Sequence, residues 1–393
     1  MSLKSVQRAP DDGNSIKAIS FVLPQYHPIP ENDELWGKGF TEWTNVVRAN
    51  PLFPGHDQPH LPADLGFYDL RLPEARAAQA MLAAEYGIYG FCYYHYWFHG
   101  RQVLERPVSE ILKSGEPDFP FCLCWANESW TRRWYGTEDA FLEQRYSAAD
   151  DLAHIRALIP FFLDRRYIRV MGRPFLAVYR VGQLPEPQRT TDLWRREAER
   201  EGLEGLFLVR VESHDGPADP RPMGFDCSLR FQPQLSVAYK SRMFRRKWWH
   251  RHKLGTGEAA FRENVISDYE VLVTSALAEP VVPYPRIPCV CPSWDNSARR
   301  KSGAIVFHNS TPERYERWLR ETVERQRTCI GFEKKSGIVP ESLVFINGWN
   351  EWAEGNHLEP CQKWGRAYLR ATLRALDGAG KKQGLPACEC SIR

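Results

Sequence analysis

The chain has 393 residues, of which 43% are hydrophobic, and its formal net charge is +3. This length supports a large core, either in one α/β barrel with insertions or in two domains. The small net charge excludes a global field that would require nucleic acid as a partner. Fourteen tryptophans and an aromatic content of 13% make the placement of these rings informative.

The terminal residues and the cysteines bear on the compartment. Residues 1–17 are polar and contain no apolar signal region, and no run approaches the roughly 18–20 apolar residues of a membrane span. Most of the ten cysteines lie in apolar runs, so we expect buried free thiols and a reducing compartment. These features predict a cytoplasmic protein, with membrane association left open. We expect residues 1–15 to be a disordered lead-in and residues 377–393 a tail or linker.

Eight short apolar runs recur along the chain, and most end in a turn rich in aromatic or polar residues. They occupy residues 18–23, 87–92, 119–124, 174–179, 206–211, 225–231, 287–291 and 343–346. Helical patterns lie between or after them, at 74–86, 103–113, 148–165, 191–201, 264–278, 312–327 and 364–376. This alternation predicts a parallel sheet covered by helices.

Eight such units fit a single (β/α)8 TIM barrel over residues 16–376. Its loops are enlarged after strand 1, at residues 28–72, and after strand 6, at residues 234–263. A doubly wound open sheet is the alternative. It is disfavoured because no glycine-rich phosphate-binding motif follows the first run.

The aromatic residues gather where the runs end, on the face that carries the active site in barrel enzymes. Nine tryptophans lie in these turns or loops: Trp36, Trp43, Trp97, Trp125, Trp130, Trp134, Trp294, Trp349 and Trp352. Core tryptophans would instead be spread through helices and strands. The pattern therefore favours an aromatic-lined groove over the core interpretation.

Two carboxylates three residues apart, Glu351 and Glu354, follow the eighth run. Paired carboxylates suit sugar chemistry, because an apolar wall can keep one protonated while the other is ionised. Gly348 and Gly355 bracket them and permit a tight turn in which both side chains face one groove. The alternative is that both are solvated loop residues, as glutamates usually are.

Further residues at the same strand ends are candidates to bind a sugar. They are Tyr26, His27, Trp43, Tyr94, His95, Trp125, Asn127, Glu128, Trp294, Asp295, Asn296, Trp349, Asn350 and Trp352. For Asp295 and Asn296, turn capping after Pro292 is the alternative. Glu42 and Trp43 lie in the long first loop and could line or cover the groove.

We expect neither a metal nor another cofactor. Glu354 and His357 match a Glu-x-x-His metal pattern, but di-iron sites need two copies and the sequence has one. The cysteine spacing does not supply a convincing zinc site.

Residues 240–253 contain seven lysines and arginines together with Trp248 and Trp249. They could contact an anionic glycan, a membrane surface or nucleic acid. A solvated loop on the barrel rim is the simpler interpretation. We expect an oligo- or polysaccharide as the partner and no nucleic acid.

Four long motifs, at residues 23–33, 36–46, 125–130 and 349–355, resemble the WbsX-like family of bacterial O-antigen and capsule polysaccharide loci. That family is similar to glycoside hydrolase family 99, the endo-α-mannosidases and endo-α-mannanases. The resemblance covers about residues 18–376. It implies a (β/α)8 barrel that hydrolyses glycosides with retention and without a metal.

The resemblance also implies roles for individual residues. Glu354 would be the general acid/base at the glycosidic oxygen. Glu351 would deprotonate the substrate's 2-hydroxyl, which attacks C1 to give a 1,2-anhydro sugar, unlike the usual retaining scheme with an enzyme nucleophile. Glu128 matches a position that binds sugar hydroxyls.

Three functions follow as hypotheses. The first is a retaining, endo-acting glycoside hydrolase on a bacterial surface polysaccharide or its lipid-linked precursor. The second is a glycosyltransferase or transglycosylase, although the sequence shows neither a Rossmann-type motif nor Asp-x-Asp. The third is a carbohydrate-binding barrel without catalysis, which the carboxylate pair disfavours.

Overall fold

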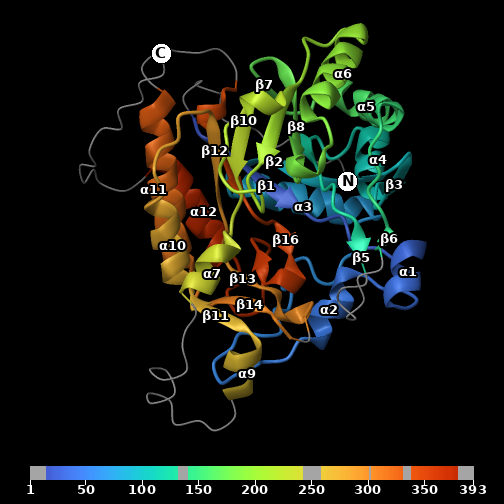
Figure 1. The fold of residues 1–393 in the computed structure, drawn as a ribbon. Helices are drawn as coiled ribbons and strands as arrows, with labels where there is room; N and C mark the ends of the chain where they lie inside the picture. Colours follow the sequence, from blue (N-terminus) through green and yellow to red (C-terminus); the bar gives the residue numbers. More distant parts are fainter. Residues whose placement is uncertain (1–14, 132–139, 242–257, 301, 331–337, 379–393) are drawn as a thin grey trace.

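The computed structural model describes residues 15–131, 140–241, 258–300, 302–330 and 338–378 (Figure 1). Eight parallel strands form its centre: β1 (Lys17–Val22), β2 (Ile88–Phe98), β4 (Phe121–Trp125), β8 (Arg173–Val178), β9 (Phe207–Val211), β10 (Cys227–Arg230), β12 (Arg286–Val290) and β15 (Leu343–Ile346). Each strand pairs with the next, and β1 pairs with both β2 and β15. The sheet is therefore closed, which confirms the predicted barrel and excludes the open sheet.

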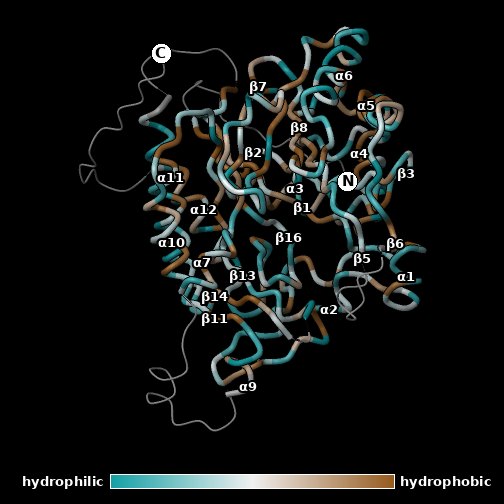
Figure 2. The backbone as a smooth tube through the Cα atoms, viewed as in Figure 1, coloured by the Kyte–Doolittle hydropathy of each residue, from teal (hydrophilic) through white to brown (hydrophobic). Residues whose placement is uncertain are grey.

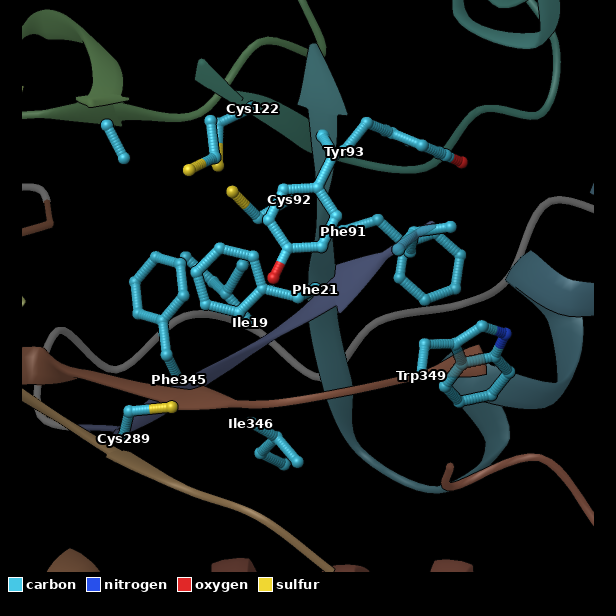
Figure 3. Close-up of a cluster of buried hydrophobic side chains, with 14 of the residues drawn as sticks. Ile19, Phe21, Phe91, Cys92, Tyr93, Cys122, Cys289, Phe345, Ile346 and Trp349 are labelled. Atoms are coloured by element: carbon cyan, nitrogen blue, oxygen red, sulfur yellow. The ribbon is translucent and has the colours of Figure 1, made fainter. Parts of the chain in front are cut away.

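The barrel interior is a packed aromatic core. The ring of Phe21 lies 5.4 Å from the rings of Tyr94, Phe231 and Phe345, measured between centroids. Figure 3 shows Phe21 beside Phe345, whereas Phe91 lies beside Trp349, with their ring centroids 5.1 Å apart. All six residues of β1 are buried, as expected for strands covered on both faces.

The cysteines behave as buried free thiols where the structure describes them. Seven are free and buried: Cys92, Cys122, Cys124, Cys227, Cys289, Cys291 and Cys361. Cys92 and Cys122 face each other across β2 and β4 (Figure 3). The side chains of Cys329, Cys388 and Cys390 lie outside the described residues.

Helices surround the barrel, as predicted. They are α3 (Pro73–Glu85), α4 (Arg106–Ser114), α5 (Ala148–Leu163), α6 (Pro187–Arg200), α10 (Tyr269–Leu277), α11 (Pro312–Ile330) and α12 (Ala367–Asp377). Figure 2 shows hydrophobic residues concentrated in the central strands and mixed colouring along these helices. Ser147 caps α5 by accepting a 3.1 Å hydrogen bond from the backbone N–H of Asp150.

One helical expectation, at residues 264–278, needs correction. The predicted helix at 264–278 begins as a strand, β11 (Val265–Asp268), because these residues pair with β14 (Ile305–His308). A strand partner overrides helical patterning there. Between β9 and β10, the described chain forms no α-helix, only the 3-10 turn η3 (Arg221–Met223).

The enlarged loops carry structure of their own. The first contains α1 (Pro30–Trp36) and α2 (Glu42–Arg48), and the second contains α7 (Leu235–Lys240) and α9 (Glu258–Glu263). Residues 242–253 of the basic stretch lie outside the described residues, as do the predicted lead-in up to residue 14 and the tail from residue 379. Within the described residues, no helix is both long and apolar enough to cross a membrane.

Short elements complete the chain. They are β3 (Arg101–Val103), β5 (Trp130–Thr131), β6 (Ala140–Leu142), β7 (Arg169–Val170), β13 (Trp294–Asp295), β16 (Asn350–Glu351), β17 (Asn356–His357), η2 (Val181–Gln183), η4 (Asn296–Ala298), η5 (Pro340–Ser342) and η6 (Trp352–Glu354). Strands β11, β14 and β13 form a separate three-stranded sheet.

Candidate active site

A small hairpin after β15 carries the two predicted catalytic carboxylates. Strands β16 and β17 pair antiparallel, and η6 joins them. Gly355 closes the turn with a φ of +55°, in the left-handed region that favours glycine. A Cβ atom there would lie 3.0 Å from the Cβ of Asp295. The hairpin therefore needs glycine at this position to lie against the turn after β12.

Glu351 and Glu354 meet at the guanidinium of Arg299. Its Nη2 lies 2.9 Å from Oε2 of Glu351, and its Nη1 lies 2.6 Å from Oε1 of Glu354. Its Nε donates a 2.8 Å hydrogen bond to Oε1 of Glu42 in α2. One cation thus contacts three carboxylates from two distant segments, α2 and the hairpin after β15. Both hairpin glutamates therefore point to the same guanidinium, and their placement in a sugar-binding groove stays a prediction.

Burial controls the protonation of these carboxyl groups. It raises the pKa of Glu351 to about 8, against the opposing effect of Arg299 and with added repulsion from Glu354 and Glu42. Burial also raises the pKa of Glu354. Although burial acts against the charged form of Arg299, the three carboxylates hold its pKa well above the usual value. Neighbouring carboxyls of this kind titrate as a unit and can share a proton.

Tyrosines surround the pair. Burial, and then the charge of Glu351, raise the pKa of Tyr94 and of Tyr96. Burial also raises the pKa of Tyr179, followed by the charges of Glu128 and Glu354. The predicted residue Tyr26 is buried, and its hydroxyl donates a hydrogen bond to the backbone carbonyl of Asn350.

Two predicted sugar ligands, Asn127 and Asn350, brace the ends of neighbouring strands in this structure. The amide of Asn350 accepts from the N–H of Leu23 at 2.7 Å and donates to its carbonyl at 3.0 Å. Asn127 accepts from the N–H of Arg180 at 2.7 Å and donates to the carbonyl of the same residue at 2.9 Å. Both amides are buried and occupied, so they join β15 to β1 and β4 to β8.

Asp295 and Asn296 are also engaged within the protein. Oδ1 of Asp295 accepts a 2.9 Å bond from the N–H of Ser297 and so caps η4. Its Oδ2 lies 2.7 Å from Nε2 of His56 and also accepts from Gln58. Oδ1 of Asn296 accepts from the N–H of Ile305 at 2.8 Å. These contacts favour the turn-capping alternative.

The tryptophans correct the expectation of an aromatic-lined groove. Six of the eight described rings at the strand ends are buried: Trp43, Trp97, Trp125, Trp294, Trp349 and Trp352. The ring of Trp352 stacks on His357 at 3.8 Å, and that of Trp125 lies 4.5 Å from His154. Trp97 and Trp125 pack against His154 of α5, and the rings of Trp43 and Trp352 lie 5.6 Å apart, so these rings are covered by other parts of the protein. Trp36 and Trp130 are half-buried, and Trp134 lies outside the described residues.

The predicted histidines lie in buried positions. Nε2 of His95 lies 3.0 Å from Nε2 of His154, and burial lowers the pKa of His95 to about 4, which keeps it neutral. Burial also lowers the pKa of His27. Nε2 of His357 lies 3.0 Å from Nδ1 of His60, whereas Glu354 turns to Arg299. No group of three or more metal-ligating side chains gathers in the part of the chain that the structure describes.

The remaining predicted carboxylate, Glu128, lies at the rim. Its side chain is 43% exposed, and Oε1 lies 2.7 Å from Nη1 of Arg180. Sequence reasoning missed the buried carboxylate of Glu359. Glu359 accepts hydrogen bonds from Gln79 at 2.7 Å, Tyr68 at 2.9 Å and Trp352 at 2.7 Å.

Sequence reasoning also missed Arg299 and, as a partner of the pair, Glu42. Arg299 stands at the end of η4 in a short basic run that resembles a solvated turn. Glu42 is 257 residues away from it in sequence. The only sequence signal was the position of both residues in loops that follow barrel strands.

Two of the most similar solved structures share this architecture. A "Glycoside hydrolase-like protein" aligns with a TM-score of 0.55 and 11% identity, covering 96% of each chain. A family 99 endo-α-mannosidase from Bacteroides thetaiotaomicron, in complex with bis-tris propane, aligns with a TM-score of 0.52 and 14% identity. That alignment covers 92% of this chain and 96% of the mannosidase. At these identities, the likeness shows the fold: a glycoside hydrolase-like barrel.

Curated relatives exist in Xanthomonas campestris pv. campestris. "Uncharacterized protein WxcX" from two strains is 42% identical over 362 residues, which is 92% of this chain and 50% of the relative. The chain thus spans about half the length of these relatives. The family model described as "Glycosyltransferase WbsX" matches residues 18–372, the whole barrel. The chain therefore belongs to the WbsX family.

Proposed function

We propose that the chain is a retaining, endo-acting glycoside hydrolase that acts on a bacterial surface polysaccharide or its lipid-linked precursor. One observation carries the proposal. Glu351 and Glu354 lie in the turn after the eighth strand of a (β/α)8 barrel, and both contact the guanidinium of Arg299. That end of the barrel is where enzymes of this fold place their chemistry. The fold shared with glycoside hydrolases supports a glycan substrate.

In the first step, the carboxylate of Glu351 takes the proton of the sugar's 2-hydroxyl, and O2 forms a bond to C1. The bond from C1 to the leaving oxygen breaks, and Glu354 donates its proton to that oxygen. The products are a 1,2-anhydro sugar and the released glycan. Glu351 is then protonated and Glu354 is ionised.

In the second step, water attacks C1 while Glu354 takes its proton. The bond between C1 and O2 breaks, and Glu351 returns its proton to O2. Two inversions at C1 give net retention, and both carboxyl groups regain their starting states. General acid–base catalysis of this kind contributes about 10²–10⁴-fold to a rate.

The scheme requires one proton on the pair, carried by Glu354 when the substrate is bound. The raised pKa of Glu351, about 8, favours its protonated form in the ligand-free protein. Moving the shared proton from Glu351 to Glu354 gives the productive form without changing the total charge. The side chain of Glu354 is 17% exposed and that of Glu351 is 7% exposed, so Glu354 is better placed to reach a leaving group.

A glycosyltransferase or transglycosylase is the second candidate, favoured by the description of the family model. A sugar hydroxyl in place of water in the second step would give transglycosylation with the same residues. Contact of the basic stretch 240–253 with an anionic glycan or a membrane surface stays a prediction, as does cytoplasmic placement.

The test compares wild-type protein with Glu351→Gln and Glu354→Gln on neutral and anionic oligosaccharides of bacterial repeat units. Mass spectrometry detects cleavage, and NMR assigns the anomer that forms first. We expect retention in the wild type and a loss of about 10²–10⁴-fold in each variant. Glu313→Gln, on an exposed face of α11, is the matched control. Full cleavage by correctly folded Glu354→Gln would falsify the assignment, and turnover of a nucleotide sugar would favour the transferase.

A further inference from the structure

Glu42 is the most deeply buried member of the charged cluster formed by Glu42, Arg299, Glu351 and Glu354. Its side chain is 1% exposed, compared with 16% for Arg299. Its Oε1 accepts from Nε of Arg299, and its Oε2 has no hydrogen-bond partner among the described residues. A capping box between Thr41 and Thr44 fixes the start of α2, which carries Glu42. Glu42 is therefore buried next to Arg299, where a glycan cannot reach it.

Arg299 is fixed by the turn after β12. Asp295 caps η4, and His56 and Gln58 from the first enlarged loop hold the other carboxylate oxygen of Asp295. Arg299 follows directly at the end of η4. The same loop thus positions Arg299 through His56 and Gln58 and supplies Glu42 as its partner.

We infer that Arg299 and Glu42 are positioning residues: Arg299 aligns Glu351 and Glu354 on one guanidinium, and Glu42 supplies the buried anion that keeps a proton on that pair. The inference deepens the proposed function by naming the groups that set the proton count of the pair. It concerns the cluster itself and can be tested without a substrate.

The charge balance gives the physical reason. If all three carboxyls were ionised, the cluster would hold three negative charges against one positive charge in a buried setting. Burial of unbalanced charge is costly, so a proton is retained. Among the residues that the structure describes, the other titratable groups that interact with the cluster are Arg300, Tyr26, Tyr94, Tyr96 and Tyr179. The four tyrosines are neutral near pH 7, since burial raises the pKa of each.

The two positioning residues carry opposite charges, so replacing each should shift the titration of the pair in opposite directions. The anion of Glu42 raises the pKa of Glu351 and Glu354, and the cation of Arg299 lowers both. Removing the charge of Glu42 should move both titrations to lower pH. Removing the charge of Arg299 should move both to higher pH. A role limited to packing would produce no such reversal.

The experiment follows the glutamate side-chain carboxyls by ¹³C NMR in the full chain labelled with [δ-¹³C]glutamate, without added glycan. Resonances are assigned by their loss in Glu351→Gln and Glu354→Gln. We expect Glu351 to titrate near pH 8 in the wild type, at lower pH in Glu42→Gln and at higher pH in Arg299→Gln. Glu313→Gln and Arg317→Gln, both on the outer surface of α11, are the charge-matched controls and should leave the titration unchanged.

An unchanged titration in Glu42→Gln, or shifts of the same sign in both variants, overturns the inference. Near-UV circular dichroism checks the folding of each variant. If Arg299→Gln does not fold, Glu42→Gln decides alone, because its amide oxygen can still accept from Arg299. If the two variants shift the titration of the pair in opposite directions but the wild type cleaves no glycan, the proposed function is rejected and this inference stands.

Discussion

At the scale of single residues, the candidate site depends on glutamates that are buried, which is rare for this residue type. Glu42, Glu351 and Glu359 are buried, although glutamates are almost never fully buried unless they are paired. Arg299 pairs with the first two, and three neutral donors satisfy Glu359. The motif around Glu351 could be found in the sequence. Glu359 and Arg299 could not, because their partners lie far away along the chain.

Glu359 gives a prediction about pH and stability. Burial raises its pKa in the folded protein to about 7, against about 4.3 in an unfolded chain. The folded state therefore binds this proton more tightly. The resulting stability is fully present below the unfolded value and is lost as the pH rises through about 7. The wild type should lose about 2–4 kcal/mol of unfolding free energy relative to Glu359→Gln between pH 4 and pH 8.5.

Urea unfolding of both proteins at several pH values measures this difference. Glu313→Gln, at an exposed position, should show no comparable change with pH. A difference between wild type and Glu359→Gln that stays constant over this range would contradict the prediction.

At the scale of elements, the site is built from turns that lie against one another. The hairpin of β16 and β17 lies against η4, and the side chain of Asn350 joins it to the end of β1. The sequence placed Gly348 and Gly355 around a tight turn. It could not show that Gly355 also borders Asp295, because that contact joins the turns after two different strands.

Gly355→Ala tests this contact, and Gly365→Ala is its matched control. Both glycines have positive φ, +55° and +49°, so each alanine should cost about 1–2 kcal/mol of backbone strain. Only the Cβ at position 355 meets another group, since Gly365 has no atom within 4 Å of that position among the described residues. We expect Gly355→Ala to destabilise by about 1–3 kcal/mol more than Gly365→Ala. Equal losses in chemical denaturation would contradict this.

At the scale of the whole molecule, the barrel is covered unevenly. No α-helix lies between β9 and β10 in the described chain, and charged groups occupy the outer side of these strands. Glu212, fully buried, accepts a 2.9 Å hydrogen bond from Tyr284 and lies 3.5 Å from Nη1 of Arg210. Arg230 and Arg286 lie 3.9 and 4.0 Å away. By strand alternation, Arg210 and Glu212 point away from the interior residues Val209 and Val211.

Glu212→Gln should therefore destabilise the barrel strongly. Removing one partner of a buried ion pair leaves the others uncompensated and typically costs about 3–5 kcal/mol. Glu270→Gln removes a partly exposed partner of Arg317 and should cost no more than about 1 kcal/mol. Thermal and urea unfolding of the two variants measure the contrast. Similar losses in both would show that the cluster contributes little to stability.

The sequence by itself determined the eight strands, most of the helices and the turn that carries Glu351 and Glu354. These are local patterns, in which apolar runs, helical periodicity and glycine positions act over a few residues. The tertiary structure alone decided which side chains meet. It buried six of the tryptophans expected in a groove, turned Asn127 and Asn350 into braces, and brought Glu42 and Arg299 to the pair. Closing the barrel brings together segments hundreds of residues apart, so burial and charge at the site depend on contacts that no local pattern encodes.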